Sequence, residues 1–163
     1  MEECCQPGTE PSLERRGPAC PSCGHNGLDV DLITLEALLQ PEALARRGES
    51  EHRFCPSPGC PVVYFGREEA FRRGDVVALV FQKEAPGHRV VCHCFGIDEE
   101  RIRQEVDASG LSPSAERIKL LVQAGRCACE VRNPQGTCCL GNVAMVVASA
   151  RVRLTPQASP VTP

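Results

Sequence analysis

The chain has 163 residues with a formal net charge of −3, and 42% of them are hydrophobic, which indicates one globular domain or two small ones. Aromatic residues make up only 4% and tryptophan is absent, so each half of the chain would build a thin core, which the twelve cysteines could support through metal sites or disulfides. The acidic balance argues against a nucleic-acid-binding protein, and no apolar run is long enough to cross a membrane.

Residues 1–18 are polar and contain several prolines and glycines, which predicts a flexible N-terminal arm. Because this arm lacks the apolar segment of a secretory signal, we expect a cytoplasmic protein whose cysteines bind metals, rather than a secreted scaffold held by disulfides. Cys4 and Cys5 are adjacent in the arm, and they form either a site for a soft ion such as Cu(I) or a pair of incidental thiols.

A first set of four cysteines lies within residues 19–88, for which we expect a zinc-binding subdomain. The set consists of a C-x2-C pair and a C-x4-C pair, formed by Cys20, Cys23, Cys55 and Cys60. This spacing is typical of tetrahedral structural zinc sites, and the prolines and glycine inside the pairs favour tight knuckles that direct two thiolates at one ion. His25 and His52 flank these cysteines and are alternative ligands.

The rest of this first part alternates between short strands and helical segments. The elements predicted in chain order are a strand at 28–33, a helix at 35–47 that Thr34 caps and Pro41 splits, a strand at 62–65, one or two helical turns at 67–73, and a strand at 76–81. The aromatic side chains of Phe54, Tyr64 and Phe65 are expected to form a hydrophobic wall beside the metal.

A second set of thiols lies within residues 89–152 and has a different spacing. It contains the C-x-C pair Cys92 and Cys94, followed by Cys129 and then by Cys139 with Cys138 beside it. Four thiolates gathered from two loops are what a [2Fe–2S] cluster requires. The C-x-C pair could place two ligands on one iron, and the Asn-Pro-x-Gly turn at 133–136 would return the chain so that the other two reach the second iron.

Helices are predicted around this second set. Asp98 caps a helix that ends at Val106, Ser112 and Pro113 open another that ends at Ala124, and a last helix spans about 139–150 before a proline-rich tail at 153–163. The first N–H groups of the last helix are expected to face the cluster. The predicted fold class is therefore α+β, in which a small zinc-knuckle α/β subdomain precedes a compact three-helix [2Fe–2S]-binding subdomain.

Three segments carry a resemblance to a known family over residues 20–150. They are FCPSPGCPVVYF at 54–65, VCHCFGIDEERI at 91–102 and CEVRNPQGTCC at 129–139. They resemble the N-terminal domain of CopZ-type copper chaperones, which holds a zinc ion and a [2Fe–2S] cluster, and the C-x-C start is also similar to bacterioferritin-associated ferredoxins. The ferredoxin-like copper domain in which such chaperones usually end, with its C-x-x-C loop, is not expected in this chain.

The resemblance implies a ligand set for each metal. On iron it places Cys92, Cys94, Cys129 and either Cys139 or Cys138; on zinc it places Cys20, Cys23, Cys55 and Cys60. Cys127 is either an alternative iron ligand or a plain loop thiol. The nearby Arg126 and Arg132 would offset the negative charge of the cluster.

These observations favour a non-enzymatic protein that moves one electron in the handling of metal ions, with copper as the expected metal. The cluster could reduce Cu(II) to Cu(I), and the partners would be a redox donor and a copper-binding protein, with neither nucleic acid nor membrane involved. A second hypothesis is a docking module whose metals only hold the fold. A third is a catalytic cysteine that a histidine activates, but none of His25, His52, His88 and His93 completes a triad.

Overall fold

Residues 19–154 are described by the computed structural model, and the first half of them folds around an antiparallel sheet. Its four strands lie in chain order and are β1 (Leu28–Val30), β2 (His52–Phe54), β3 (Val62–Phe65) and β4 (Ala70–Arg72). The helices α1 (Leu32–Leu38) and α2 (Pro41–Leu44) fill the connection between β1 and β2. Pro41 is the first residue of α2, and the predicted split of the helical segment at this proline is confirmed.

The central strand β3 is buried along its whole length and contributes to two hydrophobic clusters. Val63 and Tyr64 pack with Leu35 and Leu38 of α1 in the larger cluster. The same strand contributes Val62 and Phe65 to a smaller cluster, whose other members are Cys20, Cys55 and Cys60. The aromatic wall expected beside the cysteines is therefore formed by Phe65, whereas Phe54 and Tyr64 face α1.

Four secondary-structure predictions for this half are wrong, and the first is the strand at 28–33, which ends at Val30 because Leu32 already begins α1. The first helix begins at Leu32 after Asp31, so Thr34 lies inside it as a buried residue and does not cap it. The expected turns at 67–73 form β4 and a 3₁₀ turn, η1 (Arg73–Asp75), because Phe71 is fully buried when β4 pairs with β3. The expected strand at 76–81 makes only one isolated bridge, between Val76 and Leu39, and leaves Val77 exposed.

The second half consists of a short hairpin and a group of helices. The hairpin pairs β5 (Val90–Cys92) with β6 (Ile97–Asp98), and the helices are α3 (Glu99–Ser109), α4 (Pro113–Gln123), α5 (Cys129–Arg132) and α6 (Leu140–Leu154). Helices α3, α4 and α6 contact one another around Ile102, Val106, Ile118 and Val143. The predicted three-helix unit is confirmed, with α3 three residues longer than expected and α6 continuing to Leu154.

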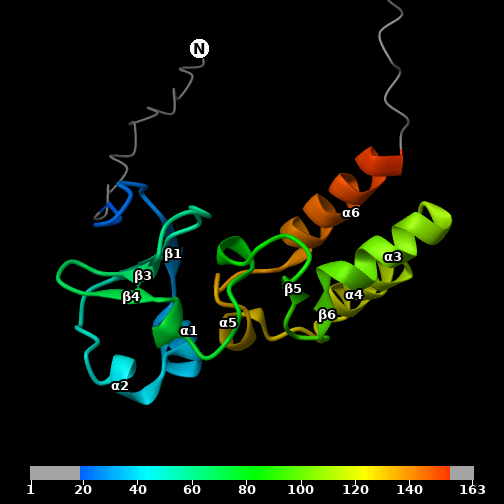
Figure 1. Ribbon diagram of the computed structural model, residues 1–163. Coiled ribbons are helices and arrows are strands. Elements are labelled where there is room, and N and C mark those ends of the chain that lie inside the picture. Colours follow the sequence, from blue (N-terminus) through cyan, green and yellow to red (C-terminus); the bar gives the residue numbers. More distant parts are fainter. Residues whose placement is uncertain (1–18, 155–163) are drawn as a thin grey trace, which may run out of the picture.

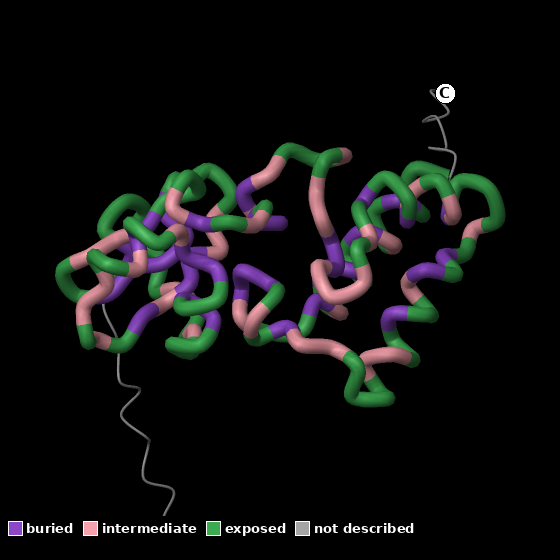
Figure 2. The backbone as a smooth tube through the Cα atoms, turned by 90° about the horizontal axis from the view of Figure 1, so that it is seen from below, coloured by how far each residue is buried: buried purple, intermediate pink, exposed green. Residues whose placement is uncertain are grey.

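The sheet and the three helices occupy opposite ends of the molecule, and α5 lies between them next to α1 (Figure 1). Figure 2 shows that both ends contain buried residues. The 3₁₀ turn η2 (Phe81–Lys83) belongs to the connection, and Phe81 already packs with the helices, so the predicted boundary at residues 88–89 stays a prediction. The antiparallel sheet followed by helices confirms the predicted α+β fold class.

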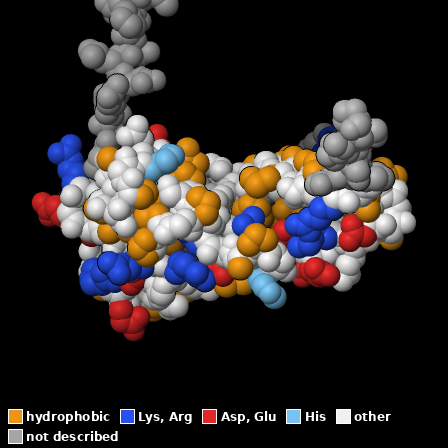
Figure 3. All heavy atoms as spheres, turned by 45° about the horizontal axis from the view of Figure 1, so that its top comes forward, with side chains coloured by type: hydrophobic (Ala, Val, Ile, Leu, Met, Phe, Trp, Pro, Cys, Tyr) orange, Lys and Arg blue, Asp and Glu red, His pale blue; other side chains and the backbone are white. Residues whose placement is uncertain are grey.

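Charges of both signs are interspersed on the face shown in Figure 3. Charged side chains of the described residues also form ion pairs, including Arg73 with Glu84 at 2.7 Å and Arg101 with Glu105 at 3.4 Å. Among the described helices, none combines the length and the hydropathy that crossing a bilayer would need. The predicted arm with Cys4 and Cys5, and the tail beyond Leu154, lie outside the described residues.

The predicted cap of α3 is confirmed, because the Asp98 carboxylate accepts a hydrogen bond from the backbone N–H of Arg101 at 2.8 Å. We expect Asp98→Ala to lower the free energy of unfolding by about 1 kcal/mol, as measured by urea denaturation. Asp107→Ala is the matched control, because Asp107 is also an exposed aspartate but lies far from the N-terminus of the same helix. Equal losses in both variants would contradict a capping role.

Candidate metal centres

The four cysteines of the first set converge although they come from segments more than thirty residues apart. The Sγ atoms of Cys20 and Cys60 are 3.7 Å apart, those of Cys23 and Cys55 are 3.6 Å apart, and all four lie within 4.8 Å of one another. Thiolates placed tetrahedrally around a zinc ion at about 2.3 Å are separated by about 3.8 Å. The arrangement therefore fits a four-thiolate zinc site with no position left for a substrate.

Local backbone geometry builds each knuckle of this quartet. The N–H groups of Cys20 and Gly24 donate to the carbonyls of His25 and Cys20, and Gly24 adopts a positive φ of 72° that favours glycine. In the second knuckle the N–H of Cys60 donates to the Ser57 carbonyl at 3.2 Å. These contacts are local, which is why the C-x2-C and C-x4-C spacings are informative in the sequence alone.

The electrostatic environment differs among the four thiols. Burial raises the pKa of Cys20 to about 12, whereas the nearby Ser57 hydroxyl, 3.5 Å from Sγ, is the main cause that lowers the pKa of the exposed Cys23 to about 6. Lys83 is buried, and its Nζ donates to the Ser57 carbonyl at 2.6 Å, so a positive charge lies beside the second knuckle. Such a charge favours a site that carries a net negative charge when four thiolates bind one divalent ion.

Neither flanking histidine joins the quartet. The His25 Nδ1 atom accepts a hydrogen bond from the Gly27 N–H at 3.1 Å, and His52 Nε2 lies 2.7 Å from the Glu69 carboxylate. Within residues 19–154, the four cysteines are the one group of three or more metal-ligating side chains whose donor atoms all lie so close together. The alternative of a histidine ligand therefore gains no support from the geometry.

The second set of cysteines is arranged as two close pairs. Cys94 and Cys129 have their Sγ atoms 3.8 Å apart, and the thiols of Cys92 and Cys139 lie close enough for each to shift the pKa of the other. No three of these four thiols lie mutually within 4.8 Å, unlike the thiols of the first set. Two separated pairs suit two metal ions better than one, because each tetrahedral iron of a [2Fe–2S] cluster takes two thiolates and two bridging sulfides.

The expectation that both thiols of the C-x-C segment share one iron stays a prediction, and the two thiols have different nearest cysteines. Each of them approaches a cysteine from the later loop: Cys94 is next to Cys129 and Cys92 is next to Cys139. The reason is that β5 continues through Cys92, which points into the helical core and is fully buried, whereas Cys94 lies two residues further in the turn of the hairpin and is only half-buried.

Backbone N–H groups and the partner thiols tune this second set. The Ala128 N–H donates to Cys94 Sγ at 3.3 Å, and the N–H groups of Cys94 and Phe95 donate to the Cys92 sulfur and lower its pKa. The hydrogen bond from Cys139 is the main cause that lowers the pKa of Cys92 to about 7, and the same interaction raises the pKa of Cys139. Burial raises the pKa of Cys129 to about 12. N–H groups directed at sulfur also stabilise a negatively charged cluster.

The remaining residues near this set differ in their exposure. Cys139 is buried directly before α6, whereas its neighbour Cys138 is exposed and Cys127 is half-buried. The Arg132 guanidinium donates to the Cys94 carbonyl at 3.4 Å, which places the expected positive charge beside the C-x-C segment. His93 is half-buried and hydrogen-bonded to the backbone of Leu79, and burial lowers its pKa.

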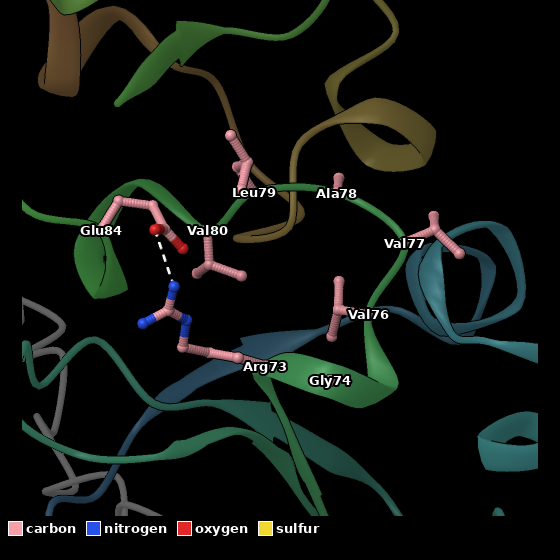
Figure 4. Close-up of a pocket in the computed structure, with 8 residues that line it drawn as sticks. All are labelled: Arg73, Gly74, Val76, Val77, Ala78, Leu79, Val80 and Glu84. Atoms are coloured by element: carbon pink, nitrogen blue, oxygen red, sulfur yellow. Dashed lines mark hydrogen bonds and ion pairs between the residues drawn. The ribbon is translucent and has the colours of Figure 1, made fainter. Parts of the chain in front are cut away.

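A pocket of about 450 Å³ lies along the connection between the two halves, and Figure 4 shows its lining. Its walls are formed mainly by the apolar segment 76–80, and Arg73 and Glu84 form an ion pair at its rim. The lining contains no cysteine and no histidine. The pocket therefore shares no residue with either set of cysteines.

Comparison with known proteins relates the part of the chain that contains the first set to a zinc-binding family. Residues 17–77 match the family model zf_CopZ, described as a zinc binding domain. The chain is 31% identical over 121 residues, 74% of its length, to the copper chaperone CopZ of Archaeoglobus fulgidus, and it spans 57% of that protein. The X-ray structure of the N-terminal domain of the same CopZ matches with a TM-score of 0.65 and 27% identity, covering 79% of this chain and 97% of that domain.

Proposed function

We propose that this chain, whose first part is a zinc-binding domain of the CopZ type, is a zinc and iron–sulfur protein that passes one electron in copper handling. The observation that carries the proposal is the contrast between the two thiol sets. One is a tight quartet suited to one ion, and the other is two close pairs suited to two ions. A protein with this composition would act in the cytoplasm, where thiols stay reduced.

In this proposal the zinc ligands are Cys20, Cys23, Cys55 and Cys60, and the ion is architectural because zinc has no redox chemistry. The iron ligands are Cys92 with Cys139 on one iron and Cys94 with Cys129 on the other. The buried and hydrogen-bonded Cys139 is preferred over the exposed Cys138. When bound, a [2Fe–2S] cluster supplies a single electron at a time.

Residues around the second set would stabilise the negative charge of a bound [2Fe–2S] cluster. N–H groups from Ala128 and from the C-x-C turn stabilise thiolate charge, and the Arg132 guanidinium adds a positive charge at the surface. Cys94 is half-buried, so this end of the set is open to a redox partner or a copper ion, whereas Cys92 and Cys139 lie in the core.

Copper reduction is tested directly with chemically reduced protein. When the protein is mixed anaerobically with Cu(II), its reduced-cluster EPR signal should disappear as Cu(I) appears. One cluster should be oxidised for each copper ion reduced, because a reduced cluster donates one electron and Cu(II) accepts one. Protein without the cluster but with all cysteines is the control, since free thiols also reduce Cu(II). Equal rates in both samples would remove copper reduction from the proposal.

A docking module is the second candidate function, and one observation favours it. Val77 and Leu79 are about half exposed on the connection between the two halves, where an apolar partner surface could pack. The measured reduction potential separates the two functions. A cluster that cannot be reduced near physiological potentials would leave the metals with a structural role and favour docking.

A further inference from the structure

We propose that the sheet half holds the loop between Cys129 and Cys139 in its ligand-presenting conformation, and that Tyr64 is the main positioning residue. The inference rests on the proposed function in taking these two cysteines as iron ligands. It goes further in assigning a second role to the zinc-binding half, which is to position the iron site of the other half. Two contacts from the sheet half carry it, and a third links the loop to the connection between the halves and to α6.

The first contact is a buried hydrogen bond across the two halves. Tyr64 lies on β3, its side chain is fully buried, and its hydroxyl donates to the Pro134 carbonyl at 2.6 Å. Burial also raises the pKa of Tyr64, so the hydroxyl stays protonated and can donate. Pro134 is itself buried, so its carbonyl needs a hydrogen-bond donor in place of water, and the Tyr64 hydroxyl supplies one.

The second contact holds the loop against α1 at Glu130 and at Gly136. The Thr34 hydroxyl donates to the Glu130 carbonyl at 2.6 Å. Gly136 has a φ of 70°, and a Cβ atom there would lie 3.0 Å from Val30 and 3.1 Å from the Thr34 hydroxyl. The turn therefore approaches β1 and α1 so closely that a side chain at Gly136 would crowd Val30 and Thr34.

The third contact centres on the Gln135 side chain, whose donors and acceptor are all in use. Its Oε1 atom accepts from Gln82 at 2.7 Å and from Asn142 at 3.1 Å. Its Nε2 atom donates to the Cys138 carbonyl at 3.1 Å and to the Thr137 hydroxyl at 3.3 Å. One side chain thus ties the connection between the halves, the loop itself and the start of α6 together.

These contacts lie between the two iron ligands that the loop supplies. Cys129 precedes the turn and pairs with Cys94, whereas Cys139 follows it and pairs with Cys92. A shift of the turn would therefore change the separation of the two pairs. The same strand links the turn to zinc, because β3 contributes Val62 and Phe65 to the cluster of zinc-site cysteines and Tyr64 to the loop contact.

The first test needs no cluster. Amide hydrogen exchange is measured in the zinc-loaded, cluster-free full chain. Tyr64→Phe, which removes only the hydroxyl, should accelerate exchange of the Asn133 and Gly136 amides by about 5- to 30-fold. Phe71→Leu is the control, because Phe71 is equally buried in the same sheet but its ring contacts His52 and Arg46. Unchanged exchange in Tyr64→Phe, or equal acceleration in Phe71→Leu, would overturn the inference.

The second test uses cluster-loaded protein and a spectroscopic readout. Tyr64→Phe should alter the visible circular dichroism of the cluster and speed its loss to an iron chelator several-fold, while the zinc content stays that of the wild type. Thr34→Val should act in the same direction and serves as the second variant if Tyr64→Phe does not fold. Wild-type spectra and release rates in both variants would overturn the inference. A wild-type protein that assembles no cluster would instead refute the proposed function, and the exchange test would still decide the positioning role.

Discussion

Replacing Cys55 with alanine should empty the zinc site and unfold the sheet half of the protein. Cys55 is fully buried and lies in a hydrophobic cluster with two other cysteines of the quartet, so three thiolates and one open position would remain. Structural zinc contributes on the order of 10 kcal/mol to the folding of small domains. This exceeds the total stability of many domains of this size, and the effect should therefore be close to complete loss of the folded sheet.

The measurements are zinc content after dialysis and urea denaturation followed by circular dichroism. Cys127→Ala is the matched control, because Cys127 is a partly buried thiol that belongs to neither close group of cysteines. It should keep one zinc and the wild-type free energy of unfolding. A Cys55→Ala protein with one zinc and undiminished stability would rule out the first set as the zinc site.

The same variant also tests whether the two halves fold independently or whether the sheet half holds the loop between Cys129 and Cys139. If the halves were independent, the helical core around Ile102 and Ile118 would stay folded and present its thiols unchanged. The hydrogen bonds from Tyr64 and Thr34 to the loop predict otherwise, because they are lost with the sheet. The helices should remain, while the loop between Cys129 and Cys139 loses its protection from exchange.

The features that the sequence allowed us to predict are those with local causes. Asp98 and the Ser112–Pro113 pair mark helix starts because a cap acts within one turn of the chain. The zinc knuckles are equally local, since each pair of cysteines closes a short loop. The chain has twelve cysteines and few aromatic residues, and this composition also indicated metals as a source of stability.

The errors occur where a distant partner decides the conformation. Residues 70–72 pair with β3 because Phe71 is buried there, which overrides the helical pattern of the segment. Val76 to Val80 has the composition of a strand, yet this segment crosses between the halves and finds one bridging partner. Two further features, which the sequence left open, also depend on distant partners: the closeness of Cys94 to Cys129 and the bond from Tyr64 to Pro134, which joins residues seventy positions apart. No pattern of neighbouring residues in the sequence indicates either contact.

The choice between Cys139 and Cys138 has the largest expected effect on the iron site. Cys139→Ser should abolish the cluster, because it removes the thiolate that we propose as an iron ligand. The Cys139 thiol pairs with Cys92 in the core, and the backbone N–H of the same residue is directed at Cys129. Serine keeps the N–H and the size of the side chain, so a loss of the cluster would report the thiolate itself.

Cys138→Ser is the matched control, since it changes the adjacent residue in the same way but at an exposed position. Anaerobically reconstituted protein should then retain two irons, two acid-labile sulfides and the visible absorption of a [2Fe–2S] centre. The Cys139→Ser protein should contain neither iron nor sulfide above background while its zinc content is unchanged, because the zinc quartet comes from other segments. The reverse result, in which iron is lost only from Cys138→Ser, would contradict this assignment and make Cys138 the iron ligand. The start of α6 would then have to turn by one residue when metal binds, so that the Cys138 side chain enters the core.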